Sequence, residues 1–331
     1  MTNRERFCAV LNGERPDRLP IVEWAGWWDK TTANWLQEGM PAGLDYHQIL
    51  AYYGMDDLFQ LWINHRRPEF PAPASHGAGL IKSRSDYLEL KKKMYAKEYL
   101  SQCLDLLRAV KPRHEAGEVT MWFTVEGFFW FPRTLFGIEP HLYAFYDEPE
   151  LMHEINRDQT AYTLWFLEEM YKVVTPDFMT FAEDMSYNHG PMLSKACYDE
   201  FVKPYYQQII PLIKSHKTHV LIDTDGDVEP LIPWFAEAGI EGVLPLERQA
   251  GVDVNRIRQH YPAWLMVGGY DKTVMHKGEE AMRNEFERIL PAMRSGRYIP
   301  AVDHQTPPDV SLENYRIYVS LLREYAAKAV E

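Results

Sequence analysis

Cysteine is scarce in this 331-residue chain, and its three cysteines form no recognisable motif. Cys8, Cys103 and Cys197 lie far apart with no Cys-x-x-Cys spacing, which excludes a thiolate metal site of that type. Each falls in a segment with helical periodicity, where we interpret it as a buried structural thiol. An odd number of unpaired cysteines fits a reducing compartment, so we expect a cytoplasmic protein.

Long apolar runs, basic tracts and common catalytic motifs are also missing. No apolar stretch approaches the about 18 residues of a membrane span, and the N-terminus has no apolar signal segment. The 35 Lys and Arg against 48 Asp and Glu give a net charge of −13, which argues against nucleic acid as a partner. No phosphate-binding loop, dinucleotide fingerprint, zinc-protease helix or nucleophile elbow stands at a suitable strand–helix junction.

What the chain does have is a regular alternation of short apolar strands and amphipathic helices. A composition of 46% hydrophobic and 25% charged residues is typical of a globular protein. Eight strand–helix units predict one α/β domain over residues 1–331, a (β/α)8 TIM barrel with residues 64–118 as a lid-like insertion near the mouth. The predicted strands cover residues 19–24, 57–63, 119–126, 178–184, 219–223, 242–247, 263–268 and 298–302.

Most of these strands end on an acid, a histidine or a polar cluster, which in a barrel places an active site at one mouth. Asp223 and Asp225 stand two residues apart, so both carboxylates can face one point. With His304 from the last strand they form a set suited to Zn²⁺, Mn²⁺ or Fe²⁺. The alternative is that Asp225 caps the next helix and Asp223 pairs with a basic side chain.

Glu183 and Asp184 are adjacent, so only one of them should point into the barrel. We predict a general acid or base here, and name Glu183, Asp184 and His304 as catalytic candidates, with helix capping or a buried ion pair as the alternative. Aromatic residues near the strand ends indicate a pocket for a flat ring, although ordinary packing explains them equally well. The substrate-binding candidates are Trp27, Glu126, Phe128, Arg133, Tyr187 and Glu247.

Several segments together resemble the uroporphyrinogen decarboxylase superfamily, and the resemblance spans nearly the whole chain. They are residues 4–20, Tyr146-Asp-Glu-Pro-Glu-Leu-Met, Gly190-Pro-Met-Leu-Ser194, Phe201-Val-Lys-Pro-Tyr-Tyr206, Gly268-Gly-Tyr-Asp271 and residues 297–304 with Glu313 and Asn314. The resemblance implies the (β/α)8 fold independently of the strand count. Decarboxylases of this kind carry arginines after the first strand that grip substrate carboxylates, whereas residues 24–29 here read Trp-Ala-Gly-Trp-Trp-Asp.

The other branch of the superfamily contains methyltransferases that work with corrinoid proteins. Those resembling coenzyme M methylases bind zinc through a His-x-Cys and a further Cys, and Asp223, Asp225 and His304 lie at or near these positions. Hard oxygen ligands in place of thiolates favour an oxygen substrate over a thiol. The resemblance therefore implies transfer of a methyl group from an O-methyl donor, such as a methoxylated aromatic, to the Co(I) corrinoid of a partner protein.

A zinc ion acting as a Lewis acid, or a protonated acid such as Glu183, Asp184 or Glu247, would help the oxygen to leave. Two other hypotheses stay open. One is a decarboxylase of a small or tetrapyrrole-like carboxylic acid, with Arg133, Arg248 or Lys272 holding the carboxylate. The other is a non-catalytic binding protein on a barrel scaffold.

Overall fold

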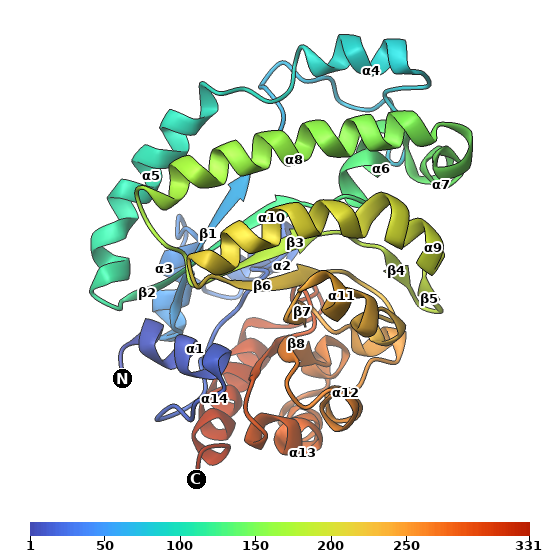
Figure 1. Cartoon of the computed structure of the whole chain (residues 1–331). Helices are drawn as coiled ribbons and strands as arrows, with labels where there is room; N and C mark the ends of the chain where they lie inside the picture. Colours follow the sequence, from blue (N-terminus) through green and yellow to red (C-terminus); the bar gives the residue numbers. More distant parts are fainter.

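Seven parallel strands curl around the centre of the molecule (Figure 1). A computed structural model describes residues 1–331. The order of the strands in the sheet is their order along the chain, so every crossover advances by one strand, as in a TIM barrel. The predicted fold class is confirmed. The sheet consists of β1 (Asp57–Ile63), β2 (Val119–Glu126), β3 (Phe178–Ala182), β6 (His219–Asp223), β7 (Gly242–Leu244), β8 (Leu265–Tyr270) and β9 (Tyr298–Val302).

The predicted first strand, residues 19–24, is wrong as a strand, because this segment is extended but joins no ladder. Leu19 donates its N–H to Ala326, Pro20 has no N–H, and the N–H of Ile21 is taken by the Asp56 carboxylate. The start of the segment therefore offers no free N–H donor for regular pairing. The segment still fills the gap between β9 and β1, since Trp24 Nε1 donates to the Val302 carbonyl at 3.0 Å.

Helices cover the outer face of the sheet, and α8 and α10 run side by side across it (Figure 1). The helices are α1 (Asn3–Asn12), α2 (Asp29–Gln37), α3 (Tyr46–Tyr53), α4 (Arg84–Lys91), α5 (Tyr99–Glu115), α6 (Trp130–Phe136), α7 (Ile138–Asp147), α8 (Pro149–Tyr171), α9 (Lys195–Cys197), α10 (Lys203–Ser215), α11 (Ile232–Ala238), α12 (Val254–His260), α13 (Glu279–Arg294) and α14 (Leu312–Lys328). Shorter elements are the hairpin β4 (Ser186–Tyr187) and β5 (Gly190–Pro191), a π-helical turn η1 (Tyr198–Val202), and 3₁₀ turns η2 (Glu229–Leu231), η3 (Arg248–Ala250) and η4 (Lys272–Lys277).

The helical part of the predicted insertion is divided into α4 and α5. The break lies between them because Tyr95 takes a left-handed backbone (φ 55°) and Arg66 bridges to Met94. Helix α5 then leads directly into β2, so it forms part of the β1–β2 crossover. We define residues 64–98 as the excursion and use that name below. No helix has both the length and the apolar composition of a membrane-spanning segment.

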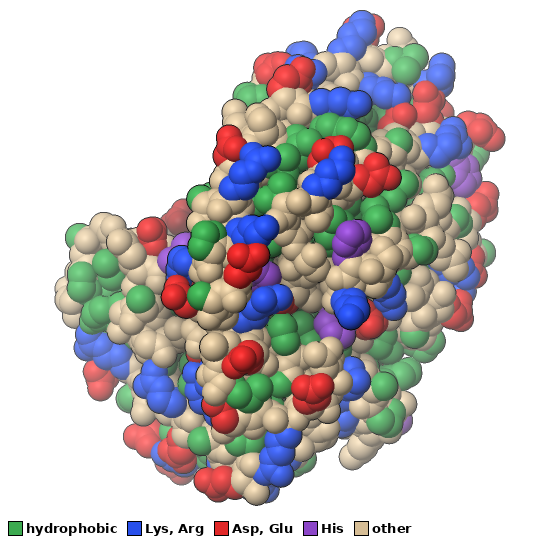
Figure 2. Space-filling model, turned by 60° about the vertical axis from the view of Figure 1, so that its left-hand side comes forward, with side chains coloured by type: hydrophobic (Ala, Val, Ile, Leu, Met, Phe, Trp, Pro, Cys, Tyr) green, Lys and Arg blue, Asp and Glu red, His purple; other side chains and the backbone are tan.

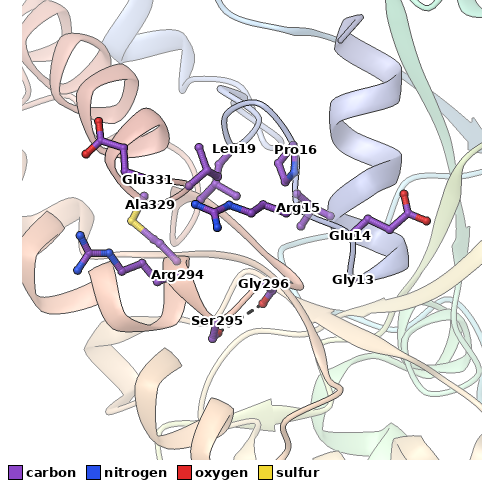
Figure 3. A pocket seen from close by; sticks show the side chains of 13 residues that line it. Gly13, Glu14, Arg15, Pro16, Leu19, Arg294, Ser295, Gly296, Ala329 and Glu331 are labelled. Carbon is purple, nitrogen blue, oxygen red and sulfur yellow. Dashed lines mark hydrogen bonds between the residues drawn. The ribbon is translucent and has the colours of Figure 1, made fainter.

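Neither the face shown in Figure 2 nor the amino end of the barrel has the features of a catalytic site. On the face shown in Figure 2, basic, acidic and hydrophobic side chains are interspersed, without a field of one sign. A cavity of about 350 Å³ lies at the end of the barrel where β9 begins, between Gly13–Pro16, Arg294–Gly296 and Glu331 (Figure 3). That is the amino end of the strands, which in TIM barrels serves stability and not catalysis.

Candidate active site

Acidic side chains from three neighbouring strands meet at the carboxyl end of the barrel. The register pairs Ala182 of β3 with Asp223 of β6, and Asp223 with Leu244 of β7, so these positions share one level. Asp184 and Asp225 follow two residues later, and Glu247 follows β7. The mutual influence of their charges confirms that Asp184, Asp223, Asp225 and Glu247 lie together. We call these four residues the acidic cluster.

One lysine, Lys272, approaches this cluster, and it is shared between Glu247 and Asp303. Lys272 Nζ lies 3.5 Å from Glu247 and 3.4 Å from Asp303, which is itself fully buried. His304 Nε2 lies 3.8 Å from Asp225 Oδ1. Burial and the nearby Lys272 charge lower the pKa of His304, so the imidazole is neutral at pH 7 and compensates no carboxylate. Asp184, Asp223 and Asp225 therefore have no dedicated cation.

Crowded carboxyl groups that form no ion pair with a Lys or Arg hold on to protons. Burial, reinforced by the charges of Asp184 and Glu247, raises the pKa of Asp225 to about 7. Burial and three neighbouring acids raise the pKa of Asp223 well above its usual range. Burial also raises the pKa of Asp184, against the lowering effect of Arg133. The cluster thus carries protons at neutral pH, shared among interacting groups.

This proton uptake predicts how stability depends on pH. In the unfolded chain an Asp titrates near 3.8, whereas folded Asp225 titrates at about 7 and folded Asp303 at about 6. A raised folded-state pKa gives stability that is present at low pH and lost as the pH rises through the folded value. We therefore expect the free energy of unfolding to fall between about pH 4 and pH 7, as measured by urea titration at a series of pH values.

The Asp223→Asn variant should reduce that slope and raise the free energy of unfolding at pH 8 by about 1–3 kcal/mol, because it removes one of the mutually repelling groups. Asp309→Asn removes an exposed acid that is not among the charges raising the pKa of Asp223 or Asp225, and it serves as the control. An unchanged slope in Asp223→Asn would contradict the assignment of protons to the cluster.

Backbone strain is concentrated at the same end of the barrel. Asp184 has φ 44° and Leu246 has φ 68°, both in the left-handed region that side chains other than Gly rarely adopt. Gly226 (φ 82°) lies so close to the hairpin that an added Cβ would stand 2.6 Å from the Tyr187 backbone. These turns fix the directions of the Asp184, Asp225 and Glu247 side chains. The Glu247 carboxylate is also held by the Gly226 N–H, which donates to its Oε2 at 3.1 Å.

Glu183, a predicted catalytic residue, lies on the opposite face of β3. Its fully buried carboxylate accepts the backbone N–H groups of Phe128, Phe129 and Trp130 at 2.7–2.9 Å, and the Tyr206 hydroxyl. It thereby satisfies the free N–H groups at the start of α6. Of the adjacent pair, only Asp184 joins the acidic cluster, so the catalytic role predicted for Glu183 is not supported by its position.

The substrate-binding candidates are divided by the structure in a similar way. Phe128 is fully buried among Phe181, Tyr205 and Tyr206, so it cannot line a pocket, and that prediction is corrected. Glu126 lies at the end of β2 on the cluster's face but is held by Arg66.

Trp27 packs against Trp35, Tyr46 and Tyr315, and leaves its indole N–H buried without a partner. Tyr187 stands exposed on the hairpin at the rim. Arg133 donates to the Asp184 carbonyl at 3.2 Å, which places it beside the cluster. Arg133, Tyr187 and Glu247 thus remain placed to meet a substrate.

Sequence reasoning missed Trp62. Gln60 and Trp62 alternate with buried residues in β1, and Gln60 donates to Thr124 on the inner face of the neighbouring strand. Residues two apart share a face, so Trp62 also faces the mouth. It is 44% exposed although it belongs to the barrel sheet. The sequence signal for Trp62 was an apolar strand with Trp at its carboxyl end. At that position an indole lies beyond the packed interior of the barrel and faces the mouth.

The predicted metal ligands do not form a ligand set as they stand. No group of three His, Cys, Asp or Glu side chains is arranged to hold a metal ion, and only Asp225 and His304 approach each other. The oxygen and imidazole donors suit a hard divalent cation, but their arrangement does not fit one. Zinc binding stays a prediction.

Elemental analysis of the purified wild type, Asp223→Ala and His304→Ala tests that prediction. A proton and a cation are alternative means of relieving the same repulsion. Near-stoichiometric zinc that disappears in both variants would establish the metal site. Zinc that is absent, or that persists in both variants, would rule out these three ligands.

Comparison with known proteins is informative at the level of the family. The family model described as Uroporphyrinogen decarboxylase (URO-D) matches residues 72–325, most of the chain. The chain belongs to this family. The chain is 24% identical over 188 residues to the uroporphyrinogen decarboxylase of Campylobacter fetus subsp. fetus (strain 82-40). This alignment covers 55% of the chain and 51% of the relative. With the uroporphyrinogen decarboxylase of Pseudomonas putida (strain W619) the chain shares 30% over 145 residues, or 42% and 40% of the two chains.

The aligned region spans about half the length of the curated relatives that this URO-D family member matches. Among solved structures, a methyltransferase from Methanosarcina mazei superposes with a TM-score of 0.64 and 14% identity, covering 98% of this chain and 99% of that one. At that identity the likeness shows the shared barrel fold alone.

Proposed function

We propose that this protein is a methyltransferase that removes a methyl group from an O-methyl donor, such as a methoxylated aromatic, and passes it to the Co(I) corrinoid of a partner protein. The observation that carries the proposal is the acidic cluster, which holds protons at neutral pH in an opening that Trp62 faces. Membership of the URO-D family, which by the resemblance described above includes such methyltransferases, supports it.

Cleaving a methyl–oxygen bond requires that the departing oxygen accept the bonding electron pair and then a proton. Asp225 is the donor that we assign, because its pKa of about 7 matches the working pH and because its side chain is more exposed than those of Glu247 and Asp303. Asp223 and Asp184 keep the proton on Asp225 by repelling its charged form. Neutral His304, 3.8 Å away, is placed to accept a hydrogen bond or to return the proton afterwards.

The corrinoid supplies the nucleophile that takes the methyl group, and it belongs to the partner protein. This chain contributes position and the proton. Trp62 and Trp28, which are about equally exposed at the rim of the barrel, offer flat apolar surface to an aromatic ring.

A decarboxylase of a small carboxylic acid is the second candidate, favoured by the names of the curated relatives and by the position of Arg133 beside the cluster. Arg248 is a poor carboxylate ligand here, because its guanidinium turns back to the Val252 carbonyl at 3.2 Å. An acidic cluster repels a substrate with many carboxylates, and this speaks against uroporphyrinogen itself.

The test combines the purified protein with reduced corrinoid proteins and a panel of methoxylated aromatics, and follows Co(I) absorbance and the phenol formed. We expect Co(I) to be consumed and phenol to appear in equal amounts for at least one donor. Release of CO₂ from a carboxylic acid without any corrinoid, and no loss of Co(I) with any donor, would replace the proposal with the decarboxylase.

A further inference from the structure

A cavity of about 410 Å³ lies between the excursion and the start of α6. Its walls are largely apolar, with Phe70 and Trp130 as the aromatic members and Leu80 and Ile138 among the aliphatic ones. A single substituted benzene ring fits a cavity of this size. Two arginines, Arg66 and Arg133, also line it.

The cavity is held in shape by backbone contacts between its two walls. Leu80 and Ile81 donate their N–H groups to the Leu135 carbonyl, and Ile138 donates to the Gly77 carbonyl. A Cβ on Gly79 would stand 2.0 Å from the Phe136 carbonyl oxygen, so only glycine permits this approach. The excursion is thus fastened to α6, and the shape of the cavity is set by the backbone.

The two arginines differ in their charge balance. Arg66 is neutralised by Glu126, donates to Thr134 at 2.7 Å, and lies over the rings of Phe70 and Phe131. Arg133 forms no ion pair with an N···O distance of 4.0 Å or less, although the chain has 48 acidic residues. Its one hydrogen bond goes to the Asp184 carbonyl, and its guanidinium lies 5.0 Å from the centre of the Trp130 ring.

An arginine that is half-buried, stacked on an indole and left without a carboxylate has unused N–H donors facing an apolar cavity. A ligand with an anionic group would complete its coordination. Arg133 connects this cavity with the acidic cluster, because it lines the cavity and also donates to the Asp184 backbone carbonyl; no residue of the cluster itself lines the cavity.

We propose that this cavity is a subsite for the anionic group of the substrate. Arg133 holds that group, and the aromatic ring of the substrate lies against Trp130. The substrate is then an aromatic acid and not a neutral ether. The inference rests on the proposed function for the identity of the reaction, but the binding itself does not depend on methyl transfer. The acidic cluster then deters binding of the carboxylate in the wrong orientation, with its charge toward Asp225.

Isothermal titration calorimetry at pH 8 tests the subsite with 4-methoxybenzoate and its neutral analogue 4-methoxybenzamide. We expect the wild type to bind the acid at least about 10-fold more tightly than the amide, as a charge-assisted hydrogen bond provides. Arg133→Met should abolish this preference, and Arg133→Lys should keep part of it. Arg67→Met, which removes a neighbouring arginine paired with Glu98 outside the cavity, is the control and should change nothing.

Circular dichroism of each variant checks that it is folded, and Arg133→Lys carries the test if Arg133→Met is not. Equal binding of acid and amide by the wild type would overturn the subsite, as would a preference that survives in Arg133→Met. If the acid binds as expected but gives up no methyl group, the subsite stands and the proposed function fails. If neutral ethers donate methyl groups and the acid has no advantage, the function stands and the subsite fails.

Discussion

Replacing Asp225 with Asn is expected to lower the rate constant of methyl transfer by about 10²- to 10⁴-fold, the usual contribution of a general acid. The amide that replaces the carboxyl group keeps the size of the side chain but cannot give a proton to the leaving oxygen. The pKa of Asp225 is about 7, so wild-type activity should fall as the pH rises through that value. The variant's residual activity should lack this descending limb, as measured by single-turnover assays from about pH 5 to 9.

The matched control is Asp227→Asn, which removes the same charge two residues further along. Asp227 accepts the Glu229 N–H at 3.3 Å, a bond that an Asn oxygen can preserve, and its charge is not among those that raise the pKa of Asp223 or Asp225. We expect its activity to be near that of the wild type. A wild-type rate in Asp225→Asn would assign the proton to another member of the cluster.

Replacing Glu183 with Ala is expected to cost about 3–5 kcal/mol of unfolding free energy. The change leaves three backbone N–H groups at the start of α6 and the Tyr206 hydroxyl without an acceptor, in a region closed to water. It also opens a cavity over Gly127, where a Cβ would stand 1.9 Å from the Glu183 carboxyl carbon. Urea denaturation at pH 7 measures the loss.

Glu183→Gln keeps an acceptor oxygen and should lose less stability than Glu183→Ala. Folded protein of either variant should retain methyl transfer within a few-fold of the wild type per molecule, because the carboxylate does not face the mouth. Full stability combined with lost activity would restore Glu183 as a catalytic residue.

The sequence predicted the barrel because its strands and crossovers carry local signals. The bounds predicted for residues 57–63, 119–126, 219–223 and 298–302 agree with β1, β2, β6 and β9. Residues 19–24 look equally apolar, but they do not pair as a strand. Backbone N–H groups of this segment donate instead to the Asp56 carboxylate and to the Ala326 carbonyl in α14. Long-range hydrogen bonds of that kind leave no mark on local periodicity.

The site was predictable in part for the same reason. Alternation along a strand allows only one of Glu183 and Asp184 to face the barrel, but it does not tell which, and the left-handed turn at Asp184 decides. The register between the strands brings Asp223 and Asp225 close to Asp184 and Glu247, and this register cannot be read from the sequence. Phe128 looked like a pocket aromatic because its partners Tyr205 and Tyr206 come from a helix more than seventy residues away.

The central claim is that the acidic cluster holds protons at neutral pH, and infrared spectroscopy of the carboxyl groups tests it most directly. Difference spectra between pH values from about 5 to 9 report protonated carboxyl groups separately from carboxylates. We expect a protonated-carboxyl band in the wild type that titrates at about 7, is diminished in Asp225→Asn, and is unchanged in Asp227→Asn. A band at pH 6 that is equally strong in Asp225→Asn and in the wild type would contradict the account, because buried Glu23 and Glu183, whose pKa values are raised to about 8 and about 7, would then explain it.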